Sequence, residues 1–110
     1  MTDRSEDSPA TALFWDLAAE LQAEDGRIVE GTIMSSPCLR VGTEFLAMNH
    51  HKTEGLVVKL PADRVAALIE AGEGQSFAPA GKVFKEWLAV TDIDEGRWRA
   101  LLREGVAFVG

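Results

Sequence analysis

The chain has a single cysteine, Cys38, and no long run of apolar residues. One cysteine cannot form a disulfide within the chain, which is typical of a protein kept in a reducing compartment. No apolar segment approaches the length of about 20 residues that a membrane-spanning helix needs. The polar, acidic stretch from Met1 to Pro9 lacks the apolar centre of a secretory signal. We therefore expect a cytoplasmic protein without a membrane segment.

Positive charge is also scarce, because 11 Lys and Arg residues stand against 18 Asp and Glu residues, a formal net charge of -7. A chain this acidic repels phosphate at long range, so nucleic-acid binding would need a local basic patch. The 110 residues suit one domain that folds without disulfides or metal. We expect a disordered tail over residues 1–8 and a single domain over residues 9–110.

The hydrophobic pattern predicts both helices and strands. One helix begins at Pro9 with Ser8 as its N-cap and is closed by Asp25-Gly26. The last helix follows Asp92, which is predicted to cap it while Glu95 reaches back. A helix is expected over residues 62–71, and strands are expected over residues 27–34, 38–41, 44–48, 55–60 and 83–90. Residues 35–37 are predicted to break the first strand, and residues 72–82 to form an irregular connector.

This order of elements predicts the fold class. A helix is followed by three or four strands, a helix, a strand and a final helix. Few crossover helices are available to join parallel strands. We therefore expect an α+β fold, a mostly antiparallel sheet of about five strands with helices packed on one face.

Residues 34–109 carry six short motifs. They are, in chain order, Cys38-Leu-Arg-Val-Gly, Phe45-Leu-Ala-Met, Gly55-Leu-Val-Val-Lys-Leu-Pro61, Phe77-x-Pro79, Lys85-Glu-Trp87 and Ala107-Phe-Val109. Together they resemble the YjbR-like proteins and the TfoX N-terminal domain. The resemblance implies helices on one side of an antiparallel sheet, and a role in DNA binding or in the regulation of competence. Met34-Ser-Ser36 stands where TfoX proteins usually have a Met-Phe-Gly turn, which weakens the case for a role in competence.

A histidine pair, the single cysteine and a glycine pair are the residues whose types could form a chemical site. His50 and His51 are adjacent on an extended segment, so their imidazoles point apart and do not readily share a metal ion with Cys38. Nothing near Cys38 lowers its pKa, so a small buried residue is the better interpretation of this thiol than a nucleophile. Gly72-Glu-Gly74 follows a helix instead of opening one, unlike a dinucleotide-binding loop. We expect no catalytic residue, no metal, no cofactor and no enzymatic activity.

Alternation along the strands places a group of basic and aromatic residues on the sheet face away from the helices. The group consists of Arg40, Lys59, Lys85 and Trp87. Such a face can bind an anionic ligand, stack a base or pack a second subunit. The competing interpretation is a half-solvated sheet whose long side chains lie across apolar surface.

Trp15 lies off the apolar stripe of the first helix, among small residues. It is either a contact for a partner or a side chain that the N-terminal tail or a loop covers. Overall we expect an interaction or regulatory module of the YjbR-like type, with a protein partner or a second copy at the sheet face or at Trp15. The alternatives are a nucleic-acid-binding regulator that uses Arg40, Lys59, Lys85 and Trp87, and a small-molecule-binding domain with a pocket between the sheet and residues 72–82.

Overall fold

The structure is a computed structural model that describes residues 9–33, 36–49, 55–78, 81 and 83–109. Within these residues the helices are α1 (Pro9–Glu24), α2 (Ala62–Glu70) and α3 (Glu95–Val109). The strands are β1 (Ile28–Ile33), β2 (Ser36–Val41), β3 (Glu44–Met48), β4 (Leu56–Lys59), β5 (Gln75–Phe77) and β6 (Phe84–Val90). The predicted α+β class is confirmed.

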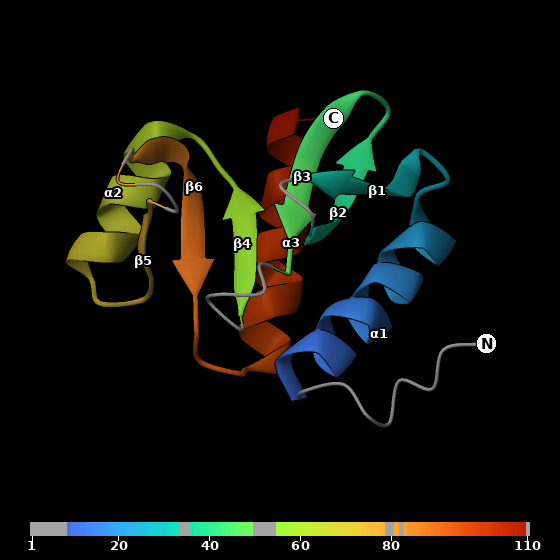
Figure 1. Ribbon diagram of the computed structural model, residues 1–110, viewed down its shortest axis with the longest axis horizontal. Helices are drawn as coiled ribbons and strands as arrows, with labels where there is room; N and C mark the ends of the chain where they lie inside the picture. The colour runs from blue at the N-terminus through green and yellow to red at the C-terminus, as the bar shows by residue number, and fades with distance from the viewer. Residues whose placement is uncertain (1–8, 34–35, 50–54, 79–80, 82, 110) are drawn as a thin grey trace.

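The described strands form one antiparallel sheet in the order β1-β2-β3-β4-β6-β5 (Figure 1). The first four strands pair in chain order, and β6 lies between β4 and β5. The sheet has six strands where about five were predicted, because β5 lies inside residues 72–82, which were expected to be irregular. β5 has three residues and buries only Phe77, which is too little for a recognisable alternation.

The predicted break at residues 35–37 was also too long, since β2 begins at Ser36. Pro37 pairs with Thr32 of β1. Proline has no N–H to donate, but the Pro37 carbonyl accepts a hydrogen bond of 3.3 Å from the backbone N–H of Asn49. The strand therefore tolerates this proline because the missing donor is the only loss.

The main core lies between the helices and one face of the sheet, and in Figure 1 α3 runs behind β3 and β4. Gly105 sets how closely α3 approaches, because a Cβ at this position would lie 2.7 Å from Leu46 Cδ1 and 3.0 Å from the Lys59 carbonyl oxygen. Fully buried members of the core are Phe14, Leu39, Leu46, Ala47, Leu56, Val58, Leu60, Leu88, Trp98 and Leu102.

The opposite face of the sheet holds a second, smaller core. Its buried members are Cys38, Met48, Val57, Phe77 and Ala89, and Phe45, Phe84 and Trp87 pack against them. The expectation of a sheet face open to solvent was therefore wrong in its centre. Aromatic side chains from three strands cover the smaller residues there, so this face also contributes to stability.

Ion pairs join the helices to one another at the surface. Arg99 Nε lies 2.7 Å from Glu20 of α1, and Arg103 pairs with Glu24 one turn further on.

The predicted cap of α3 was wrong by two residues: Asp94 Oδ1, not Asp92, accepts the backbone N–H of Arg97 at 3.1 Å. The Asp92 carbonyl instead accepts the indole N–H of Trp98 at 2.7 Å.

Candidate functional site

The register of β4 and β6 places Lys59 directly opposite Trp87. Side chains that oppose each other in an antiparallel pair share one face, with Cβ atoms about 5 Å apart. Alternation does not place Lys85, because Phe84 and Trp87 both pack in the second core, where the register of β5 and β6 shifts. Lys85 nevertheless lines one hollow together with Lys59 and Trp87. Lys59 and Trp87 are half-buried and Lys85 is exposed. The structure thus brings together three of the four residues predicted for this face.

A shallow hollow lies over this part of the sheet. Its volume is about 400 Å³, and its described lining is Lys59, Ala62, Phe84, Lys85, Glu86 and Trp87. The hollow combines two ammonium groups with an indole ring and one carboxylate, that of Glu86. An aromatic surface beside cationic groups suits a ligand that carries negative charge.

Arg40, the fourth predicted residue, lies on β2 and is separated from β4 by β3. Two strand spacings correspond to roughly 10 Å, so Arg40 belongs to the same face but not to the hollow. Its side chain lies over Gly31, where a Cβ would come within 3.1 Å of Arg40 Nε. This Nε is buried and has no hydrogen-bond partner among the described residues. The long stem of Arg40 therefore covers the sheet, as the competing interpretation of this face predicted for such side chains.

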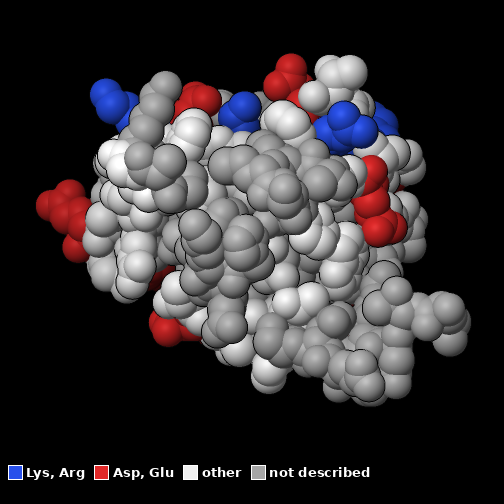
Figure 2. All heavy atoms as spheres, viewed as in Figure 1, with Lys and Arg blue, Asp and Glu red and all other residues white. Residues whose placement is uncertain are grey.

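Ion pairing separates the cations of the sheet face from the other cations. Eight Lys and Arg residues lie in the described part of the chain, and five of them pair with carboxylates: Arg27, Arg64, Arg97, Arg99 and Arg103. The other three, Arg40, Lys59 and Lys85, have no ion pair among the described residues. In the view of Figure 2, Lys and Arg side chains occur along the upper margin, with Asp and Glu side chains beside them. Figure 1 shows the end of β4 and the start of β6 at this margin.

We define the basic-aromatic face as Arg40, Lys59, Lys85 and Trp87. Among the described residues, none of its three cations lies in an ion pair, although the chain as a whole carries a formal net charge of -7. An unpaired cation keeps its full attraction for an incoming anion, whereas a cation already in an ion pair does not.

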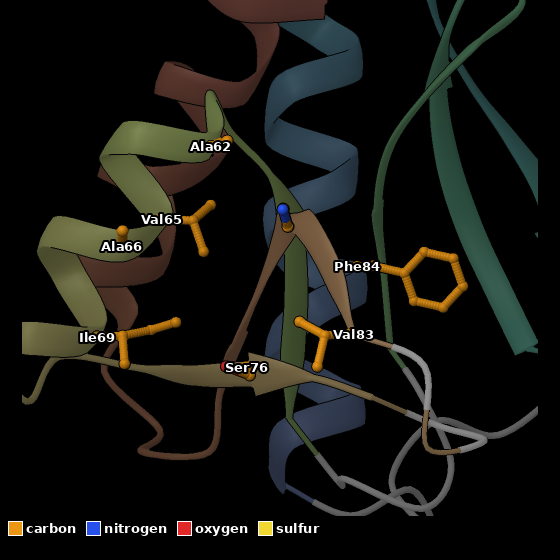
Figure 3. Close-up of a pocket in the computed structure, with 8 residues that line it drawn as sticks. Ala62, Val65, Ala66, Ile69, Ser76, Val83 and Phe84 are labelled. Carbon is orange, nitrogen blue, oxygen red and sulfur yellow. The ribbon is translucent and has the colours of Figure 1, made fainter.

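A second concavity lies next to the hollow, between α2 and β6. Its volume is about 220 Å³, and its described lining is Ala62, Val65, Ala66, Ile69, Ser76, Val83, Phe84 and Lys85. In Figure 3, Val65 and Ile69 point from α2 toward Val83, and the ring of Phe84 points away from α2. We call this concavity the α2 cavity. It adjoins the hollow, since Ala62, Phe84 and Lys85 line both.

Val65 and Ile69 lie at the spacing of a buried helix stripe, so the sequence pattern alone predicts core positions and does not indicate the α2 cavity. The small-molecule pocket was predicted between the sheet and residues 72–82, and a separate concavity of about 110 Å³ lies there, lined by residues 72–75 and 89–92. Of residues 72–82, only Ser76 belongs to the described lining of the α2 cavity. Ile69 is only half-buried and Val83 is 53% exposed. Incomplete burial of apolar residues is a property of the folded chain, and nothing in the pattern of α2 indicates it.

The indole of Trp15 is half-buried and packs against the main core. Its ring meets that of Phe14 edge-on, with centroids 5.1 Å apart and an interplanar angle of 84°. The helix face that carries Trp15 is therefore less exposed than expected. A contact with a partner at Trp15 stays a prediction, limited to the part of the ring that remains accessible.

The cysteine, the histidines and the Gly72 turn differ in what the structure shows of them. Cys38 is fully buried, and this burial raises the pKa of its thiol, which disfavours the nucleophilic thiolate. His50 and His51 lie outside the described residues. Within the described ranges, no three His, Cys, Asp or Glu side chains cluster as metal ligands would. Gly72 has a φ of 78°, which suits the turn that ends α2.

No protein-family model, no curated protein and no solved structure matches the chain. The resemblance to the YjbR-like and TfoX N-terminal families therefore stays a prediction. Among the described residues, no helix combines the length and apolar character that crossing a membrane requires.

Proposed function

We propose that the chain is a non-enzymatic interaction module of the YjbR-like type that binds a carboxylate-bearing protein surface through its basic-aromatic face. The observation that carries this proposal is the division of the cations. The arginines around the helices are matched with carboxylates, whereas no carboxylate in the described part of the chain pairs with Arg40, Lys59 or Lys85 on the sheet. Trp87 beside Lys59 adds an aromatic anchor of the kind that is enriched in protein interfaces.

A protein surface suits this face better than a nucleic acid. A nucleic acid presents closely spaced phosphates over a long surface, so it would lie against the acidic remainder of the chain, whose net charge is -7, as well as against this face. A few carboxylates on a protein surface interact mainly with nearby groups, because charges beyond about 10 Å are screened at moderate salt. The acidic surface of a second copy is such a partner, so self-association is the first case to test.

The test compares two double variants with the same change in net charge. Lys59→Gln with Lys85→Gln removes two unpaired cations of the face. Arg27→Gln with Arg64→Gln, the matched control, removes two exposed cations that are already in ion pairs. Each surface ion pair contributes about 0–1 kcal/mol, so the control should fold.

Sedimentation and light scattering at low and high salt supply the readout. The wild type and the control should self-associate at low salt, and the Lys59/Lys85 variant should remain monomeric. Equal behaviour of both variants would refute a role for the face in self-association. The same proteins are then titrated with an acidic peptide and with duplex DNA. Salt-dependent binding of DNA that needs Lys59 and Lys85 would instead favour the nucleic-acid-binding alternative.

A further inference from the structure

The described lining of the α2 cavity is apolar apart from Ser76 and Lys85. α2 contributes Ala62, Val65, Ala66 and Ile69, and the segment opposite contributes Val83. Val83 is 53% exposed, so its apolar surface is left partly uncovered next to the half-buried Ile69. Apolar surface held around a concavity without being filled favours a ligand that removes it from water.

The size of the cavity limits the ligand. An apolar cavity of roughly 150 Å³ in another protein accepts benzene. The α2 cavity, at about 220 Å³, is larger than this. One aromatic ring or a short acyl chain would fit, and a large cofactor such as a dinucleotide would not.

Charge at the mouth determines the polar end of the ligand. Lys85 lines both the α2 cavity and the neighbouring hollow, has no ion pair in the described chain, and is exposed. Lys59 lines the hollow but not the cavity, and Ser76 adds a hydroxyl to the wall of the cavity. Glu86 also lines the hollow. A carboxylate with one negative charge suits this combination better than a phosphate with two, because Glu86 and the acidic chain repel the second charge.

From these observations we infer that the α2 cavity binds a small carboxylic acid, with its ring or short acyl chain between α2 and Val83 and its carboxylate at Lys85. This inference goes beyond the proposed function, since it concerns a small ligand and a cavity on the α2 side of the basic-aromatic face. The basic-aromatic face and the lining of the α2 cavity have only Lys85 in common. A carboxylate bound there would remove one cation from the face, so the ligand and a carboxylate-bearing partner would compete.

The probe is 3-phenylpropanoate, followed by calorimetry and by the melting temperature of the full chain. Two related compounds separate its parts: 3-phenylpropanol has the same ring without the charge, and acetate has the charge without the ring. Only 3-phenylpropanoate should bind saturably and raise the melting temperature, since a ligand that binds the folded state stabilises it. Absence of saturable binding, or binding of the alcohol as tightly as the acid, would overturn the inference.

Two neighbouring alanines of α2 give a matched pair of variants. Ala66 lines the cavity and Ala67 does not, and both are exposed. Ala66→Phe should fill the cavity and weaken binding by about tenfold or more, whereas Ala67→Phe should leave it unchanged. Lys85→Gln should weaken binding of the acid by about tenfold. Lys59 belongs to the basic-aromatic face but not to the cavity lining. Lys59→Gln should therefore weaken binding of the partner and leave binding of the acid unchanged, which distinguishes failure of the proposed function from failure of this inference. Equal affinities of the Ala66 and Ala67 variants would place the ligand elsewhere.

Discussion

Replacement of Gly105 by alanine tests how closely α3 packs on the sheet. In most helices this change is favourable, because alanine has a higher helix propensity than glycine by about 1 kcal/mol. At Gly105 the added Cβ would lie 2.7 Å from Leu46 Cδ1, 3.0 Å from the Lys59 carbonyl oxygen and 3.2 Å from Val58 Cγ2. Leu46 and Val58 are fully buried and the carbonyl belongs to the backbone, so relief requires α3 to move away from β3 and β4.

The expected magnitude follows from these two opposing effects. Overpacking a core by one carbon costs about 1–3 kcal/mol, which exceeds the gain in helix propensity in most of that range. We expect Gly105→Ala to lower the free energy of unfolding by about 1 kcal/mol. For a domain of this size that corresponds to a fall in melting temperature of about 4–8 °C.

Gly96, in the first turn of the same helix, supplies the control. A Cβ at Gly96 would have Asp94 Oδ1 as its nearest neighbour, at an ordinary distance of 3.7 Å. Gly96→Ala should therefore be neutral or stabilising. Chemical denaturation of both variants gives the two free energies, and their difference isolates the effect of packing. If the Gly105 variant proved at least as stable as the Gly96 variant, the close approach of α3 to the sheet would be refuted.

Two further predictions concern titratable groups. Hydrogen bonds from the Arg27 side chain and backbone lower the pKa of Asp25 from 3.8 to about 2. Because the folded state holds this pKa low, the ion pair stabilises the protein above pH 3.8 and is lost as the pH falls toward 2. An NMR titration of the Asp25 carboxyl carbon checks this, and a midpoint near 3.8 would contradict it. Cys38, buried and with a raised pKa, should react with a thiol-specific disulfide reagent only as fast as the protein unfolds, and rapid modification of the native protein would argue against its burial.

Turn and capping residues in the sequence predicted the ends of some helices and strands correctly. Gly42 and Thr43, between the predicted strands over residues 38–41 and 44–48, mark the start of β3 correctly, and Pro9 marks that of α1. The predicted tail over residues 1–8, with the cap Ser8, lies outside the described residues. The cap of α3 was misplaced because Asp92 and Asp94 are equally capable acceptors in sequence. Only the folded path, in which the Asp92 carbonyl accepts the Trp98 indole, leaves Asp94 at the helix end.

Strand alternation grouped the residues of the candidate site but could not supply their distances. The opposition of Lys59 and Trp87 depends on the pairing of β4 with β6, which α2 and β5 separate in the sequence. Phe84 lies against Phe77, with ring centroids 5.9 Å apart, near the point where the register of β5 and β6 shifts. Such a shift changes which side chains meet, and no local pattern announces it. Residues of α2, β5 and β6 line the α2 cavity, so its presence also depends on how these elements pack and could not be predicted from the sequence.

The order of the sheet leaves β1 at one edge, with a row of backbone groups that pair with no other described strand. An edge of this kind invites a second chain to add to it. Glu30, exposed near the middle of β1, opposes that outcome. Two copies joined through β1 about a twofold axis near Glu30 would bring their two carboxylates close together, and like charges at such a junction are destabilising. The edge is thereby protected against growth into an extended sheet shared by many copies.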